Sequence, residues 1–120
     1  MSTEKLALCL SQDLSYCMPE EKNKFHREAK SVLKKVALAL GLRPSNYDIS
    51  SSKGGIAGSG EVMLQTDCFY ISIGQHFGGG ENQVLYRKCA HRKDSCGGQN
   101  NYTSASKLLD INFLNTLSNY

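Results

Sequence analysis

The sequence lacks any apolar run close to the ~18 residues that a membrane-spanning helix needs, which argues against a helical membrane protein. It also lacks the features of a signal peptide, because Glu4 precedes the short N-terminal apolar run, Gln12 and Asp13 follow it, and no small-residue cleavage pattern is present. No low-complexity tract indicates disorder. These absences predict a soluble, cytoplasmic protein that makes no membrane contact.

The chain has 120 residues, of which 40% are hydrophobic and 21% are charged, as in an ordinary globular protein. This length predicts a single domain over residues 1–120 with enough core to fold without disulfides. The five cysteines are an odd number in a chain without an export signal, so we expect reduced thiols. The formal net charge of +3 is small for a dedicated binder of duplex nucleic acid.

The clearest periodicity lies in PEEKNKFHREAKSVLKKVALALG and predicts a helix over residues 20–40. Apolar residues recur there at three- and four-residue steps along one face: Phe25, Ala29, Val32, Leu33, Val36 and Leu40. Pro19 suits the first helical position, and Gly41 supplies a left-handed end that Pro44 prevents from continuing. The same helix carries Lys30, Lys34 and Lys35, one of two places where positive charge is concentrated.

Two segments nearer the ends are also candidates for helices. TEKLALCLSQ fits either a short helix after Thr3 or a first strand, because Leu6, Leu8 and Leu10 also alternate. TSASKLLDINFLNTLSNY fits a helix that Ser104 can cap. Its apolar face should consist of Leu108, Ile111, Leu114 and Leu117, with Leu109 and Phe113 beside them.

Between these helices the apolar residues alternate, which is typical of strands. Four short segments follow one another: YDISSS, EVMLQT, CFYISIG and QVLYRKC. In the last, the buried face is either Val84 and Tyr86 or the set Leu85, Arg87 and Cys89. The short connections favour an antiparallel meander, because parallel strands need a crossover of about a dozen residues.

The order of these elements predicts an α+β domain. We expect an antiparallel sheet of about four strands, with an N-terminal and a C-terminal helix packed on one face. The opposite face should be polar enough to meet water or a partner, since it would carry Ser50, Glu61, Gln65, Tyr70 and Ser72.

Two glycine-rich segments suggest functions that their surroundings do not support. In KGGIAGSGE, Lys53 precedes the glycines and a strand follows, whereas a phosphate-binding loop needs its lysine at the start of a helix. HFGGG, from His76 to Gly80, is similar to an oxyanion turn of esterases, but that turn needs a much larger sheet. Both are expected to be loops, and no cofactor is expected.

The segment YRKCAHRKDSCGGQNNY allows several kinds of site. Cys89, His91 and Cys96 are possible zinc ligands, but their spacing is not that of a zinc knuckle and no fourth ligand is indicated. A cysteine nucleophile with His91 as its base would need a third, orienting group that the sequence does not identify. We therefore predict neither a metal site nor a catalytic site, and the chain is expected not to be an enzyme.

Recognition of a partner is the remaining interpretation of this segment. Strand alternation separates Arg87 from Lys88, and a turn after Cys89 can direct Arg92 and Lys93 outward beside His91. The predicted binding residues are Arg87, Lys88, His91, Arg92, Lys93, Gln99, Asn100, Asn101 and Tyr102. The alternative, a basic turn that only faces water, is about as well supported, because charged runs usually face solvent.

In general character the chain resembles the small accessory proteins of phages and other mobile elements, among them the anti-CRISPR inhibitors. The resemblance covers a short, single-domain chain with few catalytic patterns and many polar loops, and it assigns no residues. It implies a protein that acts by occupying another protein's surface. We expect a non-enzymatic protein that docks on a nucleic-acid-handling protein or nucleoprotein complex and inhibits or modulates it.

Two alternatives remain open. The basic residues could bind nucleic acid directly, with Tyr70, Tyr86 or Tyr102 stacking on bases. A small cysteine- or zinc-dependent enzyme is the third hypothesis. The two edges of the expected sheet could also pair across a two-fold axis in a homodimer.

Overall fold

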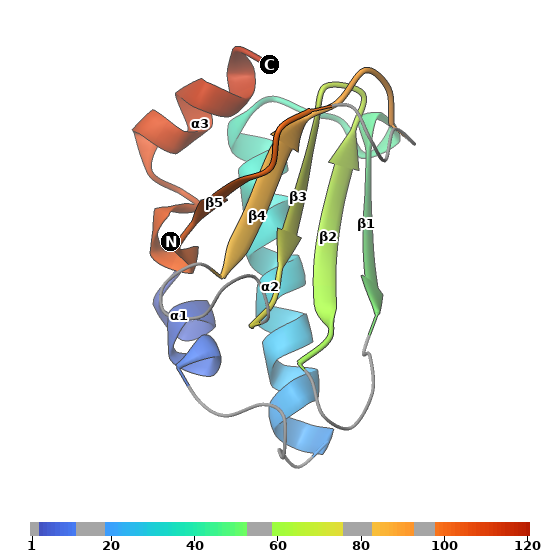
Figure 1. Ribbon diagram of the computed structural model, residues 1–120. Helices are drawn as coiled ribbons and strands as arrows, with labels where there is room; N and C mark the ends of the chain where they lie inside the picture. Colours follow the sequence, from blue (N-terminus) through green and yellow to red (C-terminus); the bar gives the residue numbers. More distant parts are fainter. Residues whose placement is uncertain (1–2, 12–18, 53–58, 76–82, 93–97) are drawn as a thin grey trace.

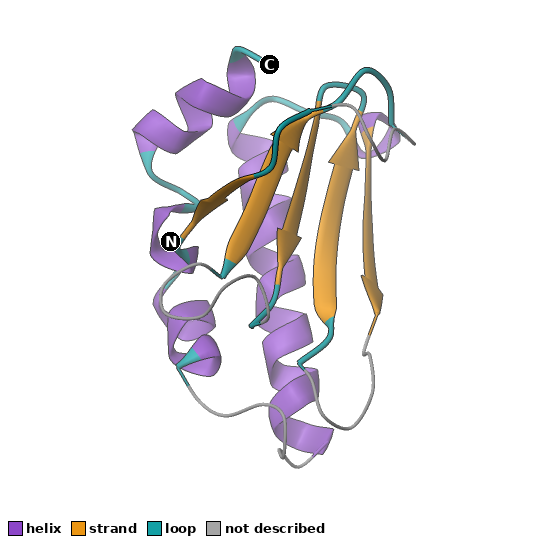
Figure 2. Ribbon diagram, viewed as in Figure 1, coloured by secondary structure: helices purple, strands orange, loops and turns teal. Residues whose placement is uncertain are grey.

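The computed structural model describes residues 3–11, 19–52, 59–75, 83–92 and 98–120. These residues form, in order, α1 (Glu4–Leu10), α2 (Pro19–Ala39), the 3₁₀ turn η1 (Pro44–Asn46), β1 (Tyr47–Ser52), β2 (Glu61–Thr66), β3 (Phe69–Ile73), β4 (Val84–Lys88), β5 (Asn101–Thr103), the 3₁₀ turn η2 (Ala105–Lys107) and α3 (Ile111–Ser118). Figures 1 and 2 show α2 running behind the sheet, with α1 and α3 beside it. The prediction of an α+β domain is confirmed.

The five strands lie side by side in the order β1-β2-β3-β4-β5, and every neighbouring pair is antiparallel. Four of them match the predicted meander, and the structure adds the short strand β5. The register places Ile49 opposite Leu64 and Ile71 opposite both Leu64 and Tyr86. One face of the sheet therefore presents an unbroken apolar row to the helices.

Helix α2 agrees with its prediction to within one residue at each end. Its first turn carries Glu20 and Glu21, whose charges complement the positive end of the helix dipole. Gly41 adopts a positive φ of 73° just after the helix, the left-handed conformation that glycine adopts without steric cost. The apolar stripe of α2 is fully or nearly fully buried at Phe25, Ala29, Val32, Leu33, Val36 and Ala37.

The N-terminal segment is a helix, which decides between the two readings of its sequence. Leu6, Cys9 and Leu10 are buried at helical spacing, whereas Leu8 is 60% exposed, opposite to what a strand with Leu6, Leu8 and Leu10 on one face would show. Burial raises the pKa of the Cys9 thiol above its ordinary value, with smaller effects from charges on α2. Cys9 therefore packs as a small neutral side chain.

Helix α3 differs from its prediction in cap and face. Its N-cap is Asp110, whose Oδ1 accepts a hydrogen bond from the backbone N of Asn112 at 2.8 Å, while Ser104 instead precedes η2. The buried residues of α3 are Phe113 and Leu117, and Ile111 is 66% exposed. The predicted face was therefore wrong at Ile111, because α3 turns Phe113 onto the ring of Tyr86.

Polar contacts tie the two N-terminal helices to one end of the sheet. His26 of α2 is buried, and its Nε2 donates to the carbonyl of Ser59 at 2.9 Å. The Ser59 hydroxyl accepts from the backbone N of Gln75 at 3.1 Å, and Gln75 Nε2 donates to the carbonyl of Leu10 at 2.9 Å. These bonds satisfy polar groups that would be costly to bury alone.

No helix in the described ranges combines the length and the apolar character needed to cross a membrane.

Candidate functional site

The sheet has an inner face, packed on the helices, and an outer face that no other described element covers in the views of Figures 1 and 2. Strand alternation and register define the outer face by its central residues: Ser50, Met63, Gln65, Tyr70, Ser72, Leu85, Arg87 and Tyr102. Of the outward residues expected from the sequence, Ser50 is exposed, whereas Ser72 is only 1% exposed. The neighbouring side chains of Met63 and Leu85 make this face more apolar than predicted.

The centre of the outer face is held in place by its own contacts. The guanidinium carbon of Arg87 lies 4.7 Å from the centroid of the Tyr70 ring, a cation–π contact between adjacent strands. Arg87 Nη1 also reaches Asn100 Oδ1 at 3.5 Å. Nearby, the Ser72 hydroxyl donates to Glu61 Oε2 at 2.7 Å. Side chains that are already ordered lose less entropy when a partner binds.

Burial on this face raises the pKa of the Tyr70 hydroxyl above its ordinary value. Hydrogen bonding with Ser72 and the positive charge of Arg87 oppose this effect, whereas the negative charge of Glu61 adds to it. The folded protein therefore disfavours the phenolate of Tyr70. The neutral hydroxyl of Tyr70 therefore contributes to the stability of the folded protein. This contribution is fully present below the pKa of an unfolded tyrosine and is lost as pH rises through the higher pKa of Tyr70 in the folded protein.

Raising the pH above about 10 is thus expected to lower the urea midpoint of the wild-type protein, and Tyr70→Phe should flatten this dependence. Urea unfolding between about pH 8 and pH 12 measures both effects. The matched control, Tyr102→Phe, removes an exposed phenol from the same face. Equal flattening by the two variants would show that burial of Tyr70 does not produce the effect.

The structure brings several predicted binding residues together at the β4–β5 edge. Arg87 and Tyr102 lie on the outer face, Asn100 contacts Arg87, and Asn101 Nδ2 donates to the carbonyl of Gln99 at 3.1 Å. Of the rest, Lys88 and His91 are exposed at and just beyond the end of β4, and Lys93 lies outside the described residues. The edge is therefore an extension of the outer face.

Tyr86 is not available for stacking on a partner. It lies on the inner face opposite Ile71, and its ring meets Phe113 edge to face at 5.0 Å between centroids, with an interplanar angle of 89°. The sequence left open whether Val84 and Tyr86 or the set Leu85, Arg87 and Cys89 would face the core. The structure places Val84 and Tyr86 on the inner face, and Cys89, which follows the end of β4, is buried as well. The expectation that Tyr86 could stack on bases is corrected accordingly.

Arg92 points back across the end of the sheet. Its Nη1 lies 3.5 Å from Asp48 Oδ2, its Nε lies 3.5 Å from Asp67 Oδ1, and its Nη2 donates to the carbonyl of Ser45 at 3.0 Å. The sequence predicted that Arg92 would turn outward beside His91, and these long-range carboxylates explain the difference. Much of the charge of Arg92 is therefore neutralised within the protein.

Gly98 permits the close approach that positions this edge. A Cβ atom at residue 98 would lie 2.5 Å from the carbonyl oxygen of Lys88, a distance that forces a backbone shift. Only glycine fits without such a shift, so the chain can pass tightly against β4 before β5 begins. This approach places Asn100 beside Arg87 and Tyr102 opposite Leu85.

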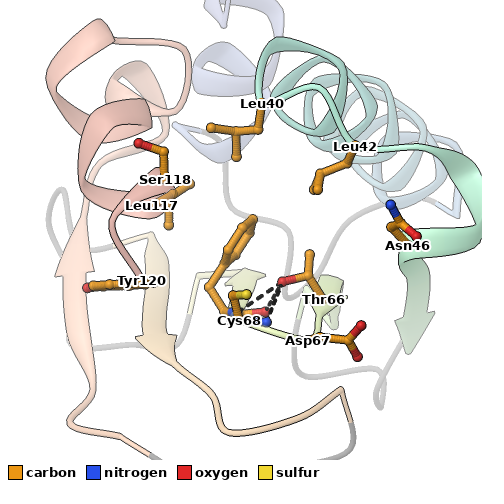
Figure 3. A pocket seen from close by; sticks show the side chains of 10 residues that line it. Leu40, Leu42, Asn46, Thr66, Asp67, Cys68, Leu117, Ser118 and Tyr120 are labelled. Atoms are coloured by element: carbon orange, nitrogen blue, oxygen red, sulfur yellow. Dashed lines mark hydrogen bonds between the residues drawn. The ribbon is translucent and has the colours of Figure 1, made fainter.

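A cavity of about 420 Å³ opens at the end of the sheet where α2 and α3 also end (Figure 3). Leu40, Leu42 and Leu117 form apolar walls with Phe69, while the polar lining residues are Asn46, Thr66, Asp67, Cys68, Ser118 and Tyr120. Thr66 shapes its floor, because its hydroxyl accepts hydrogen bonds from the backbone N of Cys68 and Phe69. The volume is within the range of small-molecule sites.

This cavity could not be predicted from the sequence, because its walls come from segments that are far apart along the chain. Of the two glycine-rich segments considered for phosphate or oxyanion binding, HFGGG and residues 53–58 of KGGIAGSGE lie outside the described residues. Cys96, a possible zinc ligand, also lies outside them. Among the side chains that are described, no three His, Cys, Asp or Glu residues gather in a way that could hold a metal ion.

Comparison of the chain with protein-family models, with curated proteins and with solved structures finds no match.

Proposed function

We propose that this chain is a non-enzymatic binding protein that docks on a partner protein or nucleoprotein through the outer face of its sheet and thereby modulates it. The observation that carries the proposal is the composition of this face. Met63, Tyr70, Leu85, Arg87 and Tyr102 adjoin one another across β2 to β5. Tyrosine, methionine and arginine are enriched at protein interfaces, and arginine and tyrosine supply many of their strongest contacts.

The charge of this face favours a protein partner over a phosphate backbone. Along β1 to β5 the outward positions carry one cation, Arg87, and two carboxylates, Asp48 and Glu61. Phosphate binding needs several free cations, whereas Arg92 at the end of the sheet is already paired with Asp48 and Asp67. That the partner is a nucleic-acid-handling protein or nucleoprotein stays a prediction from the sequence. The homodimer formed through the sheet edges also stays a prediction.

Direct binding of single-stranded nucleic acid is the second candidate. Tyr70 and Tyr102 lie on one open face with Arg87 between their strands, an arrangement on which bases can stack. Salt separates the two candidates, because contacts with phosphates weaken steeply as ionic strength rises.

The test compares affinity capture by the tagged wild-type protein with capture by the double variant Arg87→Glu/Tyr102→Ala. Each lysate is divided into nuclease-treated and untreated halves. We expect the wild-type protein to capture a discrete protein from both the treated and the untreated half. The double variant should bind this partner at least about tenfold more weakly, since interface anchors each contribute about 1–2 kcal/mol or more. Isolated partner and variants then give the affinities by titration calorimetry.

The matched control is Arg43→Glu/Ile111→Ala, which makes the same charge reversal and also truncates a large side chain to alanine, at exposed residues away from the outer face. Circular dichroism checks that both double variants are folded. Equal capture by the outer-face variant and the wild type would contradict docking by this face. A partner lost after nuclease treatment would instead support the nucleic-acid candidate.

A further inference from the structure

The solvent-facing side of α2 carries a basic hollow that the outer face does not include. Arg27, Lys30, Lys34 and Lys35 surround it with Ser31 and Leu38, and its volume is about 450 Å³. These positions recur at three, four, seven, eight and eleven residues from Arg27, so they share one side of the helix. At a rise of 1.5 Å per residue, Arg27 and Leu38 lie about 16 Å apart along the helix axis.

No carboxylate in the described part of the chain forms an ion pair with the cations of this hollow. Arg27, Lys30 and Lys34 are exposed to solvent. Between residues 27 and 38, Glu28 is the one carboxylate against four cations, so this stretch alone carries as much positive charge as the formal net charge of the whole chain, +3.

The spacing of these cations makes their repulsion a cost to the free protein. Arg27 and Lys30 are three residues apart and Lys30 and Lys34 are four apart, so like charges are neighbours on the helix surface. Such pairs destabilise a helix. An anionic ligand would reduce this repulsion. The relief of repulsion would favour binding in addition to the direct attraction between the ligand and each cation.

The hollow also has an apolar end. Leu38 is 72% exposed, the highest value among the large hydrophobic residues that the structure describes. The methylene stems of the lysines add apolar surface around it while their charged ends face water. A phosphate polymer would pair with the cations but leave Leu38 exposed to water. An acidic peptide with an apolar side chain would pair with the cations and also cover Leu38.

We propose that the Arg27–Leu38 side of α2 binds an acidic amphipathic segment of a partner protein. Its carboxylates pair with Arg27, Lys30 and Lys34, and one apolar side chain covers Leu38. In Figure 1 this helix lies behind the sheet, so its solvent-facing side is turned away from the outer face. The site is therefore independent of the proposed docking by the sheet and leaves both surfaces open to different partners.

The experiment uses three fluorescein-labelled probes in anisotropy titrations with the full chain. One is a helical peptide of about 14 residues with glutamates at i, i+4 and i+7 and leucines at one end of the same stripe. The second replaces its leucines by serine, and the third is oligothymidylate of similar length. We expect the glutamate–leucine peptide to bind most tightly, with affinity falling between about 50 and 200 mM salt.

Two variants locate the binding. Lys30→Glu/Lys34→Glu should weaken the glutamate–leucine peptide by at least about tenfold, and Leu38→Ser should weaken it while leaving the serine peptide unchanged. The matched control, Lys5→Glu/Lys107→Glu, makes the same charge change at exposed lysines outside the hollow and should have a much smaller effect. Arg87→Glu, on the outer face, should also leave this affinity nearly unchanged.

Three outcomes would overturn the proposal. Equal weakening by the control pair would show that only net charge attracts the peptide. Tighter binding of oligothymidylate, lost in Lys30→Glu/Lys34→Glu and insensitive to Leu38→Ser, would assign the hollow to nucleic acid instead. If the folded wild-type chain bound neither peptide, the proposed site on α2 would be contradicted. The separate proposal of docking through the outer face would still stand.

Discussion

Replacing Phe25 by alanine is expected to lower the free energy of unfolding by about 3–5 kcal/mol. Phe25 is fully buried in the core between α2 and the sheet, and its ring meets His26 edge to face at 5.1 Å between centroids. Among the residues that the structure describes, Phe25 is the largest fully buried side chain, and its removal leaves a cavity that the helix and sheet can fill only in part. Urea unfolding followed by circular dichroism measures the loss.

This loss is large compared with the total free energy of unfolding of a small domain, about 5–15 kcal/mol. The alanine variant is therefore expected to keep only a small net stability. Phe25→Leu keeps most of the apolar volume and should cost markedly less than the alanine variant. Lys24→Ala, at the neighbouring exposed position, should change stability by no more than about 0.5 kcal/mol. A loss at Phe25→Ala no larger than that at Lys24→Ala would contradict the packing described for α2.

Replacing Thr66 by valine is expected to cost about 2–4 kcal/mol, because a buried hydroxyl with three hydrogen bonds is lost. The hydroxyl accepts from the backbone N of Cys68 at 3.1 Å and of Phe69 at 3.0 Å, and it donates to the carbonyl of Phe69 at 3.2 Å. Valine has nearly the same shape but no hydroxyl. The two amides in the turn between β2 and β3 are then left without this acceptor.

Thr66→Ser separates the hydroxyl from the methyl group. It keeps the three hydrogen bonds and should cost only about 1 kcal/mol for the lost methyl. Hydrogen exchange should also quicken at the amides of Cys68 and Phe69 in the valine variant and stay slow in the serine variant. If both variants lost the same stability, the methyl group rather than the hydroxyl would hold this turn.

Long periodic segments could be predicted well from the sequence, because one face of each is buried along its whole length. Helix α2 begins and ends within a residue of its predicted bounds, and its apolar stripe is the one that packs on the sheet. The shorter segments were ambiguous. In α3, apolar residues occur on several sides, and contact with Tyr86 on β4 selects Phe113 and Leu117 over Ile111.

The parts that depend on distant residues could not be predicted. Strand β5 has only three residues and no alternating pattern, and it exists because β4 offers backbone partners and Gly98 permits a close approach. From the sequence, Arg92 was expected to be an outward-facing basic residue. The fold brings Asp48, 44 positions earlier, beside it and forms an ion pair that the sequence did not indicate. The sequence therefore placed Arg87, Asn100 and Tyr102 near one another, but it did not predict the ion pairs of Arg92 or the position of Met63 beside them.

The meander also determines how the chain can assemble. Each strand pairs with the next one along the sequence, so the sheet can grow by successive hairpins at a small loop-closure cost. The contact between Thr3 and the carbonyl of Ser106 joins positions 103 residues apart, which makes the docking of α1 beside η2 an entropically expensive closure. A nascent chain can therefore pair most of its sheet before residue 106 is made, and α1, which also packs on α2, gains its contact with η2 only afterwards.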